Sequence, residues 1–538
     1  SNNVAIGHYA LQQNTTGGSN VAVGSFALDA NTTNSFNTAV GYNALTTSDG
    51  ANANAAVGYQ AMRLNTTGGN NTAVGYESLY NTTTGSNNVA LGVNALYSNT
   101  TASENTAVGA NALYDNSTGT SNVAVGRMAL GNNTTANGNT ALGTDAMFTS
   151  TTGADNTSVG HNSMFANTTG AKNTAVGGYA LDANTTGDNN VAFGYYALGA
   201  ATTADKNTAL GYYAGADITT GVRNTAVGAE ALRQKTTSTD NTAIGFNAMF
   251  QSSEGNHNTC VGASAGYNIS TGEYNTVVGS AALDANTVGV RNTALGYAAM
   301  TDNTTGGYNV AVGMSALENN STASYNTAVG NNSLVSNTTG AGNVAIGSGA
   351  MKTSTDESNN VAIGLNAAEK STSASSYVAI GRHALQEQTT GDENVALGLN
   401  AGANLTTGGT NTFLGTSASS SLTTGSENIV IGRGACTHSG STTHQQNVVI
   451  GTDAVQGNAF TGGNNTIIGR QAAYSMTSGS NNSCLGSGSG NSSSPSGNIG
   501  TGSNTICLGD NNITALFCAD TSISSSDERD KADITDFK

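Results

Sequence analysis

Histidine and cysteine are the first side chains to consider for chemistry, because both bind metals and act as bases or nucleophiles near neutral pH. The chain of 538 residues has six histidines and five cysteines. His438 and His444 flank a loop with Cys436 nearby, but their spacing matches no standard zinc motif. We therefore predict surface loop residues at both histidines, and neither a metal site nor a cofactor.

The cysteines do not form a recognisable redox or metal pattern. They are Cys260, Cys436, Cys484, Cys507 and Cys518. Cys260 and Cys484 stand two residues before a recurring glycine, at a position that usually holds Ala. We expect small, buried, apolar residues there.

Charged side chains are sparse, at 9% of the chain against a typical value of about 25%. No pair of acids recurs at a spacing suited to acid and base catalysis, so we do not expect an enzyme that acts on a separate substrate. The net charge of −17 is spread thinly and argues against nucleic acid as a partner. No apolar run approaches the roughly 20 residues of a membrane-spanning helix, which argues against membrane insertion.

A glycine recurs every 17 residues from Gly7 to Gly432, which makes 26 glycines in register. A fixed period of this kind is typical of stacked repeats. We call each repeat of 17 residues a rung and count positions from its glycine. Position −4 is Asn in every rung except at Tyr377, and position −1 is Val, Ile or Leu except at Phe193. Position +3 is Ala or Ser, and position +4 is mostly Leu or Met.

Each rung therefore has apolar residues on both sides of the glycine, as in Asn37-Thr38-Ala39-Val40-Gly41. Alternation over four or five residues predicts a short strand before the glycine and a second strand after it. The glycine marks the corner between them, where positive φ is required or a side chain is excluded. A polar Asn-Thr-Thr-Gly segment such as 14–17 completes the rung as a loop.

Stacking in register places each Asn above the next, so their amides can form a hydrogen-bonded ladder at a spacing of ~4.8 Å. Because side chains alternate along a strand, the pattern also leaves one apolar stripe on the outside of the stack. Large apolar patches mark interfaces, so we expect two or three parallel copies around a common axis.

The string Asn3-Val4-Ala5-Ile6-Gly7 and its copies resemble the head repeats of YadA-type trimeric autotransporter adhesins over roughly residues 1–509. The resemblance implies a left-handed parallel β-roll, three of which pack as a homotrimeric fibre. The rung of 17 residues is longer than the usual repeat of that family, and the extra residues fall in the polar loop. The fold class is thus predicted to be all-β, a parallel β-solenoid.

The period divides the chain into four segments. Residues 1–432 hold regular rungs, and residues 433–511 hold irregular rungs with loop insertions, since the glycine intervals become 19, 18, 17 and 23. Residues 512–526 read as an exit strand and a linker, and residues 527–538 differ in kind from the repeats.

The string Ser526-Asp527-Glu528-Arg529-Asp530-Lys531 resembles the junction of the endosialidase-type intramolecular chaperone, found at the C-terminus of many phage tail fibres and spikes. In that family the chaperone assists trimerisation and is then released by self-cleavage. The resemblance implies cleavage of the Ser526-Asp527 bond, with Ser526 and Lys531 as the reactive pair. A serine hydroxyl is a weak nucleophile that a lysine of lowered pKa can activate.

We therefore expect the shaft of a trimeric viral tail fibre, extracellular on the virion, that extends towards a host receptor of glycan or protein. The chain begins at Ser1 already in register, so we expect a virion-attachment segment upstream. A trimeric cell-surface adhesin is one alternative, which an upstream secretion signal would favour. An ice-binding solenoid is another, although the Thr pairs that the repeats share, such as Thr15-Thr16, lie in loops.

Overall fold

The computed structural model describes residues 2–251, 254–494 and 497–513. It divides into two compact units, Ser1–Asn359 and Asn360–Lys538. Every regular element in the described part of the chain is a strand of three residues. The predicted all-β fold class is therefore confirmed.

The strands of the first unit recur once per rung. They are β1 (Val4–Ile6), β2 (Val21–Val23), β3 (Thr38–Val40), β4 (Ala55–Val57), β5 (Thr72–Val74), β6 (Val89–Leu91), β7 (Thr106–Val108), β8 (Val123–Val125), β9 (Thr140–Leu142), β10 (Thr157–Val159), β11 (Thr174–Val176), β12 (Val191–Phe193), β13 (Thr208–Leu210), β14 (Thr225–Val227), β15 (Thr242–Ile244), β16 (Thr259–Val261), β17 (Thr276–Val278), β18 (Thr293–Leu295), β19 (Val310–Val312), β20 (Thr327–Val329) and β21 (Val344–Ile346).

The second unit continues the same pattern and then loosens. Its strands are β22 (Val361–Ile363), β23 (Val378–Ile380), β24 (Val395–Leu397), β25 (Thr412–Leu414), β26 (Ile429–Ile431), β27 (Val448–Ile450), β28 (Thr466–Ile468), β29 (Ser483–Leu485) and β30 (Ile506–Leu508).

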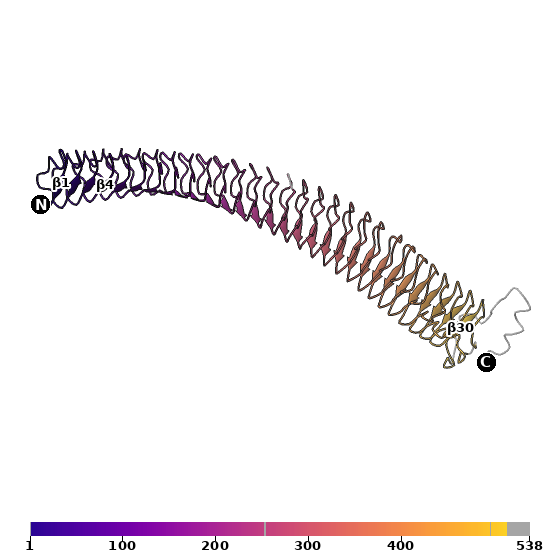
Figure 1. The fold of residues 1–538 in the computed structure, drawn as a ribbon. Helices are drawn as coiled ribbons and strands as arrows, with labels where there is room; N and C mark the ends of the chain where they lie inside the picture. The colour runs from indigo at the N-terminus through magenta and orange to yellow at the C-terminus, as the bar shows by residue number, and fades with distance from the viewer. Residues whose placement is uncertain (1, 252–253, 495–496, 514–538) are drawn as a thin grey trace, which may run out of the picture. The chain divides into compact units, whose positions relative to one another are not determined.

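Within each unit, every strand pairs in parallel with the next strand along the chain. In the pair β14–β15, for example, Thr225 lies opposite Thr242 and Ala226 opposite Ala243. The strands of a unit form a row of short arrows, with the rest of each rung looping back between them (Figure 1). Each unit is thus a parallel β-solenoid, as the period predicts.

The middle residue of each strand faces the inside of the coil. Ala226 and Ala243 are almost completely buried, whereas the Thr, Val and Ile residues that flank them are partly or largely exposed. Ala is the usual residue at this inner position, and the apolar residues of the turn fill the rest of the interior. Ala44 and Leu45, at positions +3 and +4, are both fully buried.

The predicted second strand after the glycine is wrong. Positions +1 to +6 form a turn, in which positions +2 and +4 adopt positive φ, as at Asn43 (φ 53°) and Leu45 (φ 51°). A strand would send neighbouring side chains to opposite faces, but here Ala44 and Leu45 both point inwards. The turn is still tied to the next rung, since the Leu45 N–H donates to the carbonyl of Ala61 at 3.0 Å.

The recurring glycine has both properties expected of a corner. Gly177 has φ +136°, a conformation that residues with a side chain rarely adopt. A Cβ at Gly177 would also overlap the backbone carbonyl of Gly194 in the next rung. Glycine is therefore required at this position for two independent reasons.

The predicted asparagine ladder is present, and its principal contacts are with the backbone. The Asn37 N–H donates to Asn20 Oδ1 at 2.9 Å, and Asn37 Oδ1 accepts from the Asn54 N–H at 2.9 Å. Asn37 Nδ2 donates across its own rung to the carbonyl of Ala51 at 2.9 Å. Each buried amide thus closes its own coil and joins it to both neighbours.

A second column of asparagines occupies position +7. Asn303 Nδ2 donates to Asn286 Oδ1 in the preceding rung at 2.9 Å and to the carbonyl of Gly306 at 3.0 Å. The same position holds Asn in many rungs and other residues elsewhere, including the buried Lys235. Where Asn occupies this position, its Nδ2 thus joins the loop to its own rung and, as at Asn303, to the rung before it.

The irregular rungs of the second unit keep their strands in register. Val448 pairs with Thr466, and Ser483 pairs with Ile506 across the longest interval. Larger residues replace Ala at the inner strand position, including Val449 and Ile467. The insertions are therefore accommodated outside the strands. Of the predicted exit strand, only residues 512 and 513 are described, and neither is in a strand.

Replacement of the corner glycine by alanine should destabilise the solenoid sharply. For Gly177→Ala we expect a loss of about 2 kcal/mol or more, because strain at positive φ adds to the overlap with Gly194. Gly178→Ala is a matched control, since a Cβ there would make only ordinary contacts, the nearest with the Tyr195 ring at 3.5 Å. Chemical denaturation measures both. Equal losses at the two glycines would contradict the role assigned to the corner.

Candidate functional site

The predicted reactive pair, Ser526 and Lys531, lies outside the described residues, as does the bond between Ser526 and Asp527. The structure therefore neither brings the two side chains together nor separates them. Their role remains a prediction from the sequence.

The prediction of surface residues around Cys436 is wrong for His444, which is fully buried. In the preceding rung, the carbonyl of Gly425 accepts a hydrogen bond from Asn411 Nδ2, the amide at position −4. His444 stands at the equivalent place, since its carbonyl accepts from Asn428 Nδ2 at 3.0 Å. Its ring nitrogens lie 3.3 Å from Ser419 Oγ and from Asn428 Oδ1. Burial lowers the pKa of His444 to about 4, so the side chain is neutral at pH 7. His438 is half-buried.

The cysteines at the inner strand position behave as expected. Cys260 and Cys484 are fully buried, and Cys484 lies opposite Cys507 in the pair β29–β30. Burial raises the pKa of the Cys260 and Cys484 thiols to about 12, which makes them poor nucleophiles. Both act as small apolar core residues.

The described residues offer no built site for a metal ion. No three His, Cys, Asp or Glu side chains within residues 2–251, 254–494 and 497–513 come close enough to share one. The same residues include no helix with the length and apolar character to cross a membrane.

The outward face of the strands, which we call the strand face, is a continuous surface of each unit. It consists of the first and third residues of every strand. In β6, Val89 is 39% exposed and Leu91 is 46% exposed. In β12, the exposed residues are Val191 and Phe193. The predicted apolar stripe on the outside of the stack is thus confirmed.

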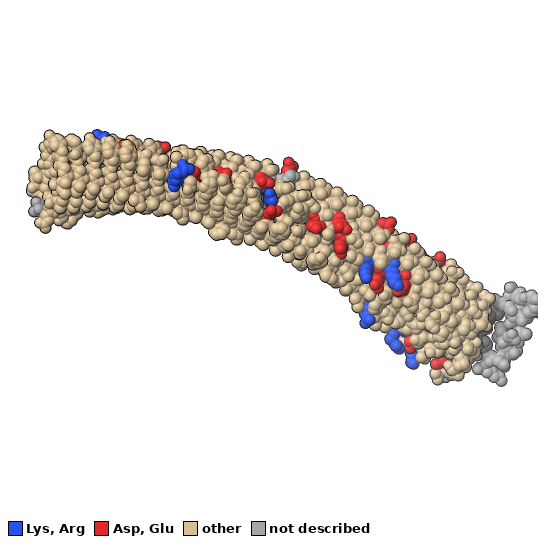
Figure 2. Space-filling model, in the orientation of Figure 1, with Lys and Arg blue, Asp and Glu red and all other residues tan. Residues whose placement is uncertain are grey.

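The strand face carries no charge. In β1–β21 the outward positions hold only Val, Thr, Ala, Ile, Leu and Phe. Charged side chains lie elsewhere, and a few of them pair across neighbouring rungs, as in Arg127–Asp145 and Arg223–Asp240. Figure 2 shows one face of the molecule, on which Lys, Arg, Asp and Glu are few and separated by wide uncharged areas.

Threonines also occupy the strand face, in addition to the loop pairs considered from the sequence. Strands β13–β18 all begin with an outward Thr, in register from one strand to the next. The loop threonines bond to the neighbouring rung instead, as where Thr185 Oγ1 donates to the carbonyl of Thr202 at 3.0 Å. Thr columns therefore exist both in the loop and on the strand face.

Aromatic columns are a feature that the sequence reasoning missed. Tyr42, Tyr59 and Tyr76, at position +1, stack with ring centroids 5.5 and 5.1 Å apart. A second column, at position +5, begins with Tyr80 and Tyr97, which lie 5.2 Å apart. The signal was available, because tyrosines separated by the repeat length must lie one above another.

Lys235 is the one fully buried lysine among the described residues, and it occupies the position of the second asparagine column. Its Nζ donates to the carbonyl of Gly255 at 2.7 Å. No carboxylate within the described part of the chain forms an ion pair with it. Burial lowers the pKa of Lys235 to about 7.

A search of known families and a search of curated proteins found nothing that matches this chain. The candidate functional surfaces are therefore argued from their own geometry.

Lys235→Asn should stabilise the protein, and the gain should depend on pH. Between pH 10.5 and about 7 the unfolded lysine is charged while the buried one is neutral, so the gain grows as the pH falls through this window. Below about pH 7 it levels off at a few kcal/mol. Thermal unfolding at several pH values measures it. Lys206→Asn, at an exposed lysine, is the control. A gain that stays constant from pH 6 to 11 would contradict the claim that burial lowers the pKa of Lys235.

Proposed function

We propose that this chain forms the shaft of a homotrimeric fibre, in which three left-handed solenoids run parallel and bury their strand faces against one another. The most specific form of the proposal is a viral tail fibre that extends from the virion towards the host surface. Left-handedness and the number three come from the resemblance of the repeats to trimeric adhesin heads.

The observation that carries the proposal is the uncharged strand face, in which an unbroken apolar column of third strand residues runs beside a column of mostly Thr and Val. In the first unit it continues over 21 successive strands without one charged side chain. Single exposed apolar residues are ordinary, but a contiguous patch of this size is unusual for a surface in water. Burial between identical copies would remove it from solvent.

Parallel association around an axis suits a repeating surface. Every rung offers the same outward pair of residues, so copies in register make the same contact at each level. Closed cyclic symmetry limits the number of copies, whereas an open arrangement would leave one strand face exposed.

The segment 526–531 supports a viral origin, through its resemblance to the chaperone junction of phage fibres. In this proposal three chaperone copies assist assembly, and cleavage of the Ser526-Asp527 bond then releases them. A virion-attachment segment upstream and a host receptor, glycan or protein, complete the set of partners. A trimeric cell-surface adhesin shares the same assembly and differs in what precedes Ser1.

Ice binding is a second candidate, which the threonine column on the strand face favours. In β13–β18 an outward Thr and an outward Leu, Val or Ile stand in register from strand to strand, which gives a regular surface whose rows repeat every ~4.8 Å. This activity needs a free strand face, whereas the trimer needs a buried one. A solution of monomers with thermal hysteresis would therefore favour ice binding over the fibre.

A charge placed on the strand face should break the trimer. Leu210 is already 46% exposed in a single chain, so Leu210→Glu would cost a monomer less than about 0.5 kcal/mol. In an interface it would bury an unpaired charge at each subunit, and we expect a loss of several kcal/mol or dissociation. Thermal unfolding and light scattering measure the effect. Thr203→Glu, at an exposed loop position, is the control. A harmless Leu210→Glu would exclude burial of this face.

Self-cleavage is tested by intact mass spectrometry of the chain produced together with any sequence that follows Lys538. We expect the mature species to end at Ser526. Ser526→Ala and Lys531→Ala should each retain the downstream segment, because the nucleophile or its base is lost. Glu528→Gln is a control within the same segment. Identical masses for the wild type and both alanine variants would refute the assigned pair.

A further inference from the structure

The aromatic column at position +5 has a gap in the first unit. Tyr97 and Tyr114 stack at a centroid distance of 5.2 Å and an interplanar angle of 6°. Phe148 and Phe165 stack at 5.6 Å and 22° two rungs further on. Gly131 occupies the rung between them, so one ring of the column is missing.

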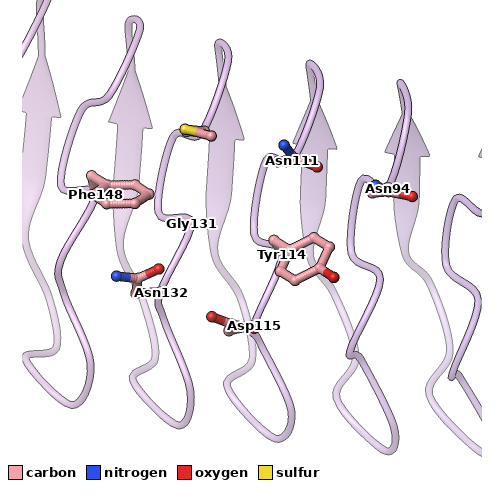
Figure 3. Close-up of a pocket in the computed structure, with 8 residues that line it drawn as sticks. Asn94, Asn111, Tyr114, Asp115, Gly131, Asn132 and Phe148 are labelled. Carbon is pink, nitrogen blue, oxygen red and sulfur yellow. The ribbon is translucent and has the colours of Figure 1, made fainter.

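A hollow of about 410 Å³ lies at this gap. Figure 3 shows that its lining residues come from the turn segments, which pass in front of the strands, and that Tyr114 and Phe148 stand on either side of Gly131. The Phe148 ring leans towards the glycine, since a Cβ at Gly131 would lie 3.0 Å from its Cδ2 and Cε2. The hollow therefore has two aromatic walls.

Polar side chains border the aromatic walls on two sides. Asp115 and Asn132 stand one rung apart on one side, and Asn94 and Asn111 stand on the other (Figure 3). Asn94 Oδ1 is buried and has no hydrogen-bond partner among the described residues. Asp115 belongs to no ion pair within the described chain, and partial burial raises the pKa of its carboxyl. The Asp115 carboxyl, which is only partly buried, is therefore available to a ligand.

We propose that this hollow is a carbohydrate-binding site that holds one pyranose ring between Tyr114 and Phe148. Because the Phe148 ring leans towards Gly131, a sugar ring in the hollow would stack on Tyr114 and contact Phe148 on its other side. A pyranose whose substituents are all equatorial carries axial C–H groups on both faces, and these suit the negative faces of two aromatic rings. Its equatorial hydroxyls point outwards, where Asp115 and Asn132 accept and donate hydrogen bonds.

Other ligands of similar size fit the site less well. A flat aromatic molecule would stack on both rings but would leave the carboxylate and the amides without partners. A nucleotide would bring its phosphate to Asp115 and to a chain of net charge −17. A neutral β-gluco-configured sugar satisfies both the walls and the polar border, which agrees with the general make-up of small-molecule sites.

The site does not need the trimer in order to exist, because it lies on the turn segments and not on the strand face. Recognition of a host glycan at this site, however, rests on the proposed function. In a trimer the hollow would occur three times, which raises the avidity for a repeated glycan above the affinity of one site.

The test is a titration of the full chain with methyl β-D-glucopyranoside, followed by saturation-transfer NMR and calorimetry. We expect a Kd on the order of millimolar for a single sugar. Tyr114→Ala should weaken binding about tenfold or more, because it removes one wall. Tyr267→Ala is the matched control, since Tyr267 stands at the same rung position and stacks on Phe250 at 5.2 Å.

Gly131→Tyr fills the hollow with the ring that the column lacks. It should abolish binding. Because a Cβ at Gly131 would lie 3.0 Å from the Phe148 ring, that ring must move back for the new tyrosine to join the stack, and circular dichroism checks that the variant keeps the wild-type fold. Methyl β-D-galactopyranoside, which has an axial hydroxyl on one face, should bind at least several-fold more weakly. The site is refuted if the wild type does not bind the glucoside, if Gly131→Tyr still binds it, or if the two sugars bind equally. None of these outcomes depends on the trimer, so failure of the site is distinguishable from failure of the fibre.

Discussion

The hydrogen bonds of the position −4 asparagine hold each coil closed and fix its distance from the next. In one rung, Asn173 Nδ2 donates across the coil to Gly187 at 2.8 Å, while its Oδ1 accepts from the Asn190 backbone at 2.8 Å. A buried amide that loses either partner costs about 1–3 kcal/mol, so each rung constrains its neighbours. The glycine corner adds a steric constraint of the same period. Since both constraints repeat every 17 residues, all surface columns of the rungs are brought into register.

The register explains why surface features appear as columns. Any residue type that recurs at one rung position forms a row at the strand spacing, whether it is Thr on the strand face or Tyr in the turn. Where one rung has a different residue type at such a position, the column is interrupted at that rung. Gly131 leaves a hollow in an aromatic column, and Lys235 leaves a buried amine in an asparagine column. The two surfaces with proposed roles are separate, because the strand face is uniform and the hollow lies in the turn.

Much of the fold could be predicted from the sequence, because the period and the residues −4 to 0 determine the strand, the corner and the ladder. The turn after the glycine could not, since apolar residues at +3 and +4 are compatible with a strand until the positive φ at positions such as Leu45 is known. His444 was misplaced for a related reason, because polarity indicated a surface residue whereas its backbone supplies a ladder acceptor. The hollow at Gly131 was not predicted, although the column of Tyr80, Tyr97 and Tyr114 that it interrupts is visible at a separation of 17 residues. Ser526 and Lys531 rest on a sequence motif alone.

The most direct measurement is the mass of the purified chain in solution, by light scattering coupled to size exclusion. If the strand faces are buried in a trimer, the mass will be close to three times the 53.4 kDa of one chain and will not fall on dilution. A stable species of 53.4 kDa would mean that the strand face stays in water, which would contradict the fibre and favour a solenoid that works as a single chain.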